Sequence, residues 1–177
     1  MPVQIGGKPE SDFSNPLGLL SDCHRRIERF LGVLVRIHDE RKGGELLREE
    51  KAALDTALTY FRNSAPKHTA DEEESLFPRM RQANAGLECL DKLEGDHQAA
   101  NRDHETVESL GRQWLTGPLS DEQSRELAAA LKRLVALYAR HIAIEDNELF
   151  PLAAQVVPED QLAAIGREMA DRRGLAK

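Results

Sequence analysis

One eleven-residue pattern occurs twice in this chain. The first copy, HTADEEESLFP, starts at His68, and the second, HIAIEDNELFP, starts at His141. In each copy a glutamate follows the histidine by four residues, and Leu-Phe-Pro follows at the same distance. Because four residues span a little more than one helical turn, each His/Glu pair is expected on one helix face. The fold must therefore accommodate two helices that each carry a histidine and a carboxylate on one side.

Apolar residues recur at alternating steps of three and four in four long segments, which is typical of helices packed along one stripe. Asn15-Pro16 predicts the start of the first helix, and Ser120 with Gln123 predicts a capping box at the start of the fourth. The third helix is expected over 87–115. Pro66 should kink the second helix or start a new segment, and Pro78 should help to end that helix, with Asn84 to Gly86 as the turn.

These segments predict an all-α fold. Short turns between four long helices favour an up-down-up-down antiparallel four-helix bundle with a short C-terminal fifth helix. The expected organisation is an N-terminal tail over residues 1–13, the bundle over 14–157, and a C-terminal helix over 158–177 that packs on the bundle.

Composition narrows the class of protein. No apolar run approaches the roughly 20 residues of a membrane helix, and the N-terminus lacks the apolar core of an export signal. The net charge of −7 and the absence of a Lys/Arg block argue against nucleic-acid binding. Two cysteines among 177 residues make no disulfide framework. We expect a cytoplasmic protein without nucleic-acid or membrane partners; a protein partner is left open.

Two further histidines obey the same repeat. His24 and His97 are 73 residues apart, as are His68 and His141. In an antiparallel bundle all four should lie at the same end and point inward. Burial of a carboxylate costs several kcal/mol unless it is paired or binds metal. The apolar stripes of these helices contain no Lys or Arg that could pair with the two glutamates. The sequence therefore predicts a dinuclear metal site formed by His24, His68, Glu72, His97, His141 and Glu145.

In this site each metal would have two histidines and two oxygens from bridging carboxylates, with one position open for a small ligand. Imidazole and carboxylate suit iron, manganese or zinc. Additional contacts with the metal are left open for Glu28, Glu73, Asn101 and Asp146. Taken alone, one His/Glu pair would be interpreted as an exposed pair on a helix surface that contributes a few tenths of a kcal/mol to stability. The alternative for the whole chain is a structural or interaction bundle without metal.

The paired pattern and its Leu-Phe-Pro tails resemble the hemerythrin-like HHE cation-binding family over about residues 15–173. Myohemerythrin is itself a known four-helix bundle of this topology. The resemblance implies a non-haem centre of two oxo- or hydroxo-bridged iron ions, ahead of manganese or zinc, and gives the six residues above the roles of ligands. Oxygen-carrying hemerythrins have a further histidine where this chain has Asn101, and their aspartate corresponds to Asp146.

Those differences make simple oxygen carriage a poor expectation. The resemblance instead implies a protein that binds dioxygen, nitric oxide or peroxide in sensing, stress protection or iron handling. The alternatives are an enzyme that decomposes peroxide or reduces nitric oxide, and an iron-centre repair protein, each of which would use the same site. Whether the protein is an enzyme stays open at this point.

Overall fold

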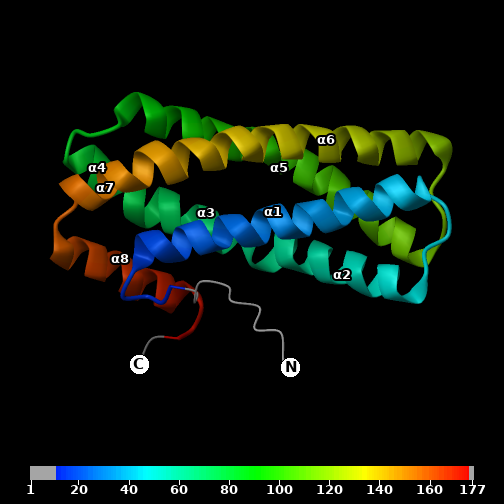
Figure 1. Ribbon diagram of the computed structural model, residues 1–177, viewed down its shortest axis with the longest axis horizontal. Coiled ribbons are helices and arrows are strands. Elements are labelled where there is room, and N and C mark those ends of the chain that lie inside the picture. Colours follow the sequence, from blue (N-terminus) through cyan, green and yellow to red (C-terminus); the bar gives the residue numbers. More distant parts are fainter. Residues whose placement is uncertain (1–10, 176–177) are drawn as a thin grey trace, which may run out of the picture.

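Four long helical segments run antiparallel and a fifth, shorter helix covers one end of them (Figure 1). The computed structural model describes residues 11–175, so residues 1–10 of the expected tail and residues 176–177 lie outside the described part. No residue between 11 and 175 forms a strand. In chain order the elements are α1 (Pro16–Arg41), α2 (Arg48–Asn63), α3 (Ala65–Asp71), η1 (Glu72–Leu76), α4 (Phe77–Gln82), α5 (Leu87–Thr116), α6 (Asp121–Ile144), η2 (Glu145–Leu149), α7 (Phe150–Val156) and α8 (Glu159–Arg172).

The predicted helix starts are confirmed. The Asn15 side chain accepts a hydrogen bond of 3.1 Å from the Gly18 N–H, and Pro16 is the first residue of α1. Ser120 and Gln123 form the expected capping box, with bonds of 3.2 and 3.0 Å. These caps satisfy backbone N–H groups that would otherwise have no partner at the two helix starts.

The second and fourth bundle helices each contain a π-helical turn, and this corrects one expectation. Pro66 does start a new segment, α3. The helix does not end near Pro78, because η1 lets it continue as α4. In η1 the Phe77 N–H bonds to the Glu72 carbonyl, five residues back. Pro78 thereby falls in the first turn of a renewed α-helix, where its missing N–H costs nothing.

The apolar interior is divided into two clusters. One lies among α1, α2, α5 and α6 and includes Leu34, Leu58, Trp114 and Leu131. The other lies among α1, α4, α5, α7 and α8 and includes Phe77, Leu90, Leu149 and Ile165.

Because the helices continue past Pro78 and Pro151, the predicted metal site lies between these clusters instead of at an end of the bundle. The α8 helix packs on α1 and α3, beside this level (Figure 1). None of the helices within residues 11–175 is long and apolar enough to cross a membrane.

Candidate metal centre

Six buried polar side chains form a layer across the bundle between the two apolar clusters. Each of the four bundle segments contributes one histidine, and the glutamates are the first residues of the two π-helical turns. No side chain of the set is more than 9% exposed, and both glutamates are fully buried. They are His24 on α1, His68 on α3, Glu72 in η1, His97 on α5, His141 on α6 and Glu145 in η2.

The six side chains form two groups that share both glutamates. One group is His24, His68, Glu72 and Glu145, and the other is Glu72, His97, His141 and Glu145. Within each group the candidate ligand atoms lie within 4.8 Å of one another. The structure therefore brings together all six residues predicted from the sequence, in the arrangement of two histidines per position and two shared carboxylates.

The Nε2 atoms of the histidines face the carboxylate oxygens. The Nε2 of His24 lies 3.0 Å from Glu145 Oε2, and that of His141 lies 3.2 Å from the same atom. Glu72 Oε1 lies 3.2 Å from His68 Nε2, while its Oε2 lies 3.4 Å from His97 Nε2. Each glutamate thus contacts one histidine from the first half of the chain and one from the second, as a bridging ligand must.

The donor set fits metal ions. The four carboxylate oxygens of Glu72 and Glu145 and the Nε2 of His24 are buried without a hydrogen-bond partner of normal geometry. Such atoms cost about 1–3 kcal/mol each, and more when charged, unless something else satisfies them. The Nε2 atoms of His97 and His141 also lie 3.1 Å apart, so the two rings aim at a common point. A cation between these atoms would satisfy all of them, and imidazole with carboxylate suits iron, manganese or zinc.

The electrostatics of the layer favour positive charge. Burial lowers the pKa of His24, but contacts with Asp146, Glu145 and Glu72 outweigh it and raise this pKa to about 12. Burial likewise opposes protonation of His97, yet Glu72 and Glu73 raise its pKa to about 9. For Glu72, burial raises the pKa, but neighbouring histidines, His68 first, hold it well below the usual value. The Glu72 carboxylate therefore stays ionised and draws cations into the layer.

Two further carboxylates hold histidines from behind. Asp146 Oδ1 lies 3.0 Å from His24 Nδ1 and accepts a hydrogen bond of 2.7 Å from Ser21 Oγ. Glu73 Oε1 lies 2.7 Å from His97 Nδ1. A carboxylate that accepts from Nδ1–H fixes the tautomer and leaves Nε2 free to bind metal. Asp146 and Glu73 therefore contact the outer nitrogens of the rings instead of joining the six, and they obey the same 73-residue repeat.

Glu28 and Asn101 are not part of this layer, which corrects the suggestion that either could contact metal. Both side chains are exposed. A residue four positions after a histidine lies about 40° further round the helix, since each residue turns about 100°. The buried stripe instead passes through Ile27 and Ala100, three residues after each histidine.

Asp96 is a candidate positioning residue that the sequence did not indicate. It is 9% exposed, its Oδ2 lies 3.5 Å from His141 Nδ1, and its Oδ1 accepts a bond of 2.6 Å from Arg140. The repeat could not reveal it, because the equivalent position 73 residues earlier is Cys23. Its role follows from α5 lying next to α6, which only the folded chain shows.

Loss of the Glu73 carboxylate should weaken metal binding without unfolding the protein. In Glu73→Ala the His97 Nδ1 loses its acceptor, and we expect metal affinity to fall about 10- to 100-fold. A competition titration of the reconstituted protein against a chelator measures this change. Glu74→Ala is the matched control, because Glu74 is exposed and pairs only with Arg172 among the described contacts. Equal affinities in the two variants would show that Glu73 does not position the ring.

His104 lies outside the ligand layer, seven residues beyond His97 on α5. Its Nε2 lies 2.7 Å from the hydroxyl of Tyr138, and its ring packs against Phe61. The Tyr138 ring in turn contacts the ring of His141 edge-on, with centroids 6.3 Å apart. The hydrogen bond of His104 therefore links α5 to the Tyr138 ring beside the layer.

The His104 side chain should make stability depend on pH. Burial lowers its pKa from 6.5 to about 4, opposed only by the charge of Asp103. The unfolded chain therefore takes up the proton first, so the contribution is complete above pH 6.5 and is lost as pH falls to 4. It amounts to at most about 3 kcal/mol. Urea unfolding of His104→Gln and of the parent at several pH values should show a smaller loss for the variant; parallel curves would refute this.

The comparison with known proteins decides the family. The hemerythrin HHE cation binding domain matches residues 15–153, which include all six residues of the layer. The chain belongs to this family. An uncharacterized protein of Haemophilus influenzae is 29% identical over 163 residues, which cover 91% of this chain and 91% of that protein. Membership of the hemerythrin HHE family agrees with a helical bundle that brings together two buried groups of possible metal ligands.

Proposed function

We propose that this hemerythrin-like protein holds two iron ions and binds a small ligand, dioxygen, nitric oxide or peroxide, in sensing, stress protection or iron handling. One ion would be held by His24 and His68 and the other by His97 and His141. Glu72 and Glu145 would bind both. Bound iron would supply coordination positions and redox chemistry for the ligand.

The size of the space beside the histidines carries this proposal. A small pocket, here called the central pocket, has a volume of about 10 Å³. That is roughly the room of one water molecule. Its walls are the four histidines with Ile27, Ala65, Thr69, Tyr138 and Ile142. So small a space beside the histidines has no room for an organic substrate, which leaves molecules of a few atoms as ligands.

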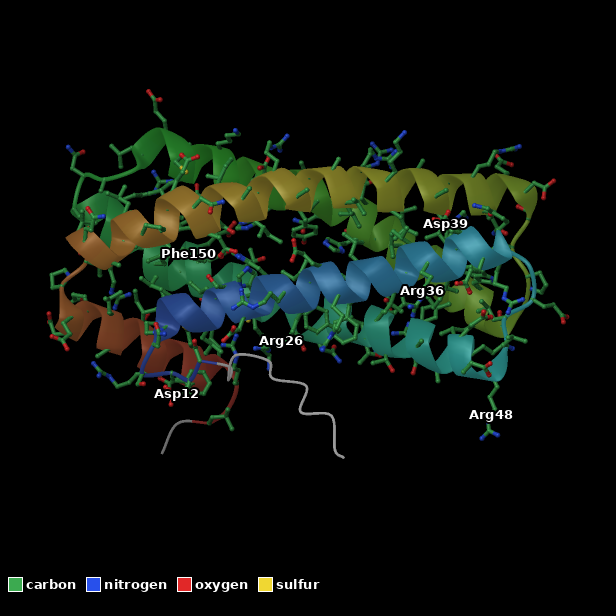
Figure 2. The ribbon with its side chains drawn as sticks, in the orientation of Figure 1. Asp12, Arg26, Arg36, Asp39, Arg48 and Phe150 are labelled. Atoms are coloured by element: carbon green, nitrogen blue, oxygen red, sulfur yellow. The ribbon has the colours of Figure 1, made fainter. Side chains whose placement is uncertain are left out.

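Side chains around the layer hold the histidine rings in orientation. Phe150, labelled at the start of α7 in Figure 2, stacks on the His24 ring with centroids 5.4 Å apart. Phe77 stacks in the same way on His97, at 6.3 Å. These rings, and the carboxylates of Asp146 and Glu73, hold the histidines in orientation and restrict water at the layer. The free thiols Cys23 and Cys89 are consistent with a reducing, cytosolic setting.

Metal analysis with an optical spectrum tests the proposal. Protein produced with iron should contain about two ions per chain, as the two groups of ligands imply. The spectrum should change on addition of dioxygen, nitric oxide or peroxide. A protein without iron and without spectral change would contradict the proposal. Turnover of peroxide or nitric oxide that disappears in His141→Ala would instead identify an enzyme.

A further inference from the structure

A second, larger hollow lies close to the central pocket and is mainly apolar. It is a groove between α2, α3 and α5 with a volume of about 360 Å³. Its apolar walls come from Leu58, Phe61, Pro66 and Val107. His104 and the polar side chains of Arg62, Glu105, Glu108 and Ser109 also line it. We call this hollow the α2–α5 groove.

Two adjacent pairs of residues separate the groove from the central pocket. Along the chain, Pro66 lines the groove and its neighbour Ala65 lines the pocket. Across the bundle, His104 lines the groove and its hydrogen-bond partner Tyr138 lines the pocket. The His104–Tyr138 hydrogen bond therefore forms part of the wall between the two spaces. A rotation of either ring would thin that wall without moving a helix.

The wall carries no net charge at neutral pH. Burial lowers the pKa of His104 to about 4, so its imidazole is neutral. The Tyr138 hydroxyl lies 2.7 Å from the imidazole Nε2, within hydrogen-bond distance. Ionised groups hold water tightly, whereas a neutral pair with apolar neighbours favours passage of uncharged molecules.

We propose that the α2–α5 groove is the access route by which an uncharged diatomic ligand reaches the central pocket, with the His104–Tyr138 pair as its gate. The inference rests on the proposed function and narrows its ligand class. Dioxygen and nitric oxide are small and apolar and suit this route, whereas peroxide is polar and does not. A gate changes how fast the ligand enters and leaves, and leaves its equilibrium affinity unchanged.

A filled groove should slow ligand binding. Ser109 is exposed and lines the groove, so Ser109→Trp places a large ring in it and leaves the ligand layer intact. Stopped-flow mixing of the iron-loaded protein with nitric oxide should then show association slowed about tenfold or more, with unchanged affinity. The control, Ala128→Trp, fills a groove of about 350 Å³ between α1 and α6 and should leave the rate unchanged. Equal rates in the two variants would overturn the route.

A second variant tests the gate. Tyr138→Phe keeps the ring but removes the hydroxyl that bonds to His104. Association and dissociation of nitric oxide should both accelerate by the same factor. If affinity falls while the association rate is unchanged, the hydroxyl contacts the bound ligand and the pair is not a gate.

Xenon provides a readout that needs no iron, because apolar cavities bind it. In methyl-labelled protein, dissolved xenon should shift the NMR signals of Leu58 and Val107 in the groove. These shifts should disappear in Ser109→Trp. Xenon shifts without any ligand binding to iron-loaded protein would refute the proposed function alone. Ligand binding with no xenon in the groove would refute the access route alone.

Discussion

Glu145→Ala is expected to remove both metal ions, whereas His68→Ala should leave about one ion per chain. The difference follows from the geometry: Glu145 belongs to both groups of ligands, while His68 belongs to one. In His68→Ala the group of Glu72, His97, His141 and Glu145 stays complete. Elemental analysis of the purified variants, after reconstitution with iron and gel filtration, gives the two stoichiometries directly.

The loss of both ions should also lower thermal stability. At free metal of about 1,000 times Kd, each bound ion stabilises the fold by about 4 kcal/mol. For a domain of this size that predicts a fall in Tm of at least about 10 °C for Glu145→Ala in the presence of metal. Calorimetry with and without chelator measures it.

Glu148→Ala is the control for this experiment, since Glu148 is exposed in the same π-helical turn. It should keep both ions and the parent Tm. Retention of one firmly bound ion in Glu145→Ala would refute the shared role of the carboxylate. If the Tm of the parent protein were the same with and without chelator, the stabilisation by metal would be refuted.

Asp71→Ala should cost about 3 kcal/mol in the free energy of unfolding. The Asp71 side chain is fully buried one residue before Glu72, and it pairs with Arg172 at 3.0 Å and Arg173 at 2.6 Å. Removal of one member of a buried ion pair costs about 3–5 kcal/mol, because its partners stay desolvated. The arginine side chains are 19% and 20% exposed, so part of that cost is relieved by water.

A comparison of variants separates this coupling from simple truncation. The double variant Arg172→Ala/Arg173→Ala leaves the Asp71 carboxylate buried and should be about as unstable as Asp71→Ala. The triple variant should lose clearly less than the sum of the two, in urea unfolding followed by circular dichroism. Asp171→Ala, at an exposed neighbour, should change little. Additive losses would show that the arginines of α8 do not hold Asp71.

The bundle and the six polar residues of its central layer could be predicted because they rest on local rules. Asn15, Ser120 and Gln123 signal helix starts through hydrogen bonds to nearby backbone, which the sequence shows directly. The six side chains share helix stripes with apolar residues, so their burial follows from spacing alone. Asp96 could not be found in this way, because its contact with His141 joins residues of two helices that are 45 positions apart in sequence.

The π-helical turns were missed, although the sequence does contain a signal for them. His68, Glu72, Leu76 and Met80 are all buried, and they follow one another at strict steps of four. In an α-helix each step of four drifts by about 40°, so three steps would carry Met80 about 120° away from His68. A wider turn takes up that drift. A helix whose buried residues are separated by several consecutive steps of four, without a step of three, is therefore predicted to contain a π-helical turn.

Glu28 and Asn101 are exposed because their helices, α1 and α5, contain no π-helical turn. On α1 and α5 the buried stripe continues with a step of three, to Ile27 and Ala100, as a regular helix requires. Among the four bundle helices, the two that carry Leu-Phe-Pro have buried residues at several consecutive steps of four after the histidine. A residue four positions after a histidine is therefore buried on the helices that contain a π-helical turn and exposed on α1 and α5.

The division of the interior into two apolar clusters has a consequence for maturation of the protein. Each cluster can form its own contacts before metal arrives, while the polar layer between them gains little until the cations bind. Opening of the chain at that level should therefore cost less than opening of either cluster. We expect a newly made chain to fold first and to admit its ions afterwards, through local separation of the helices at the layer.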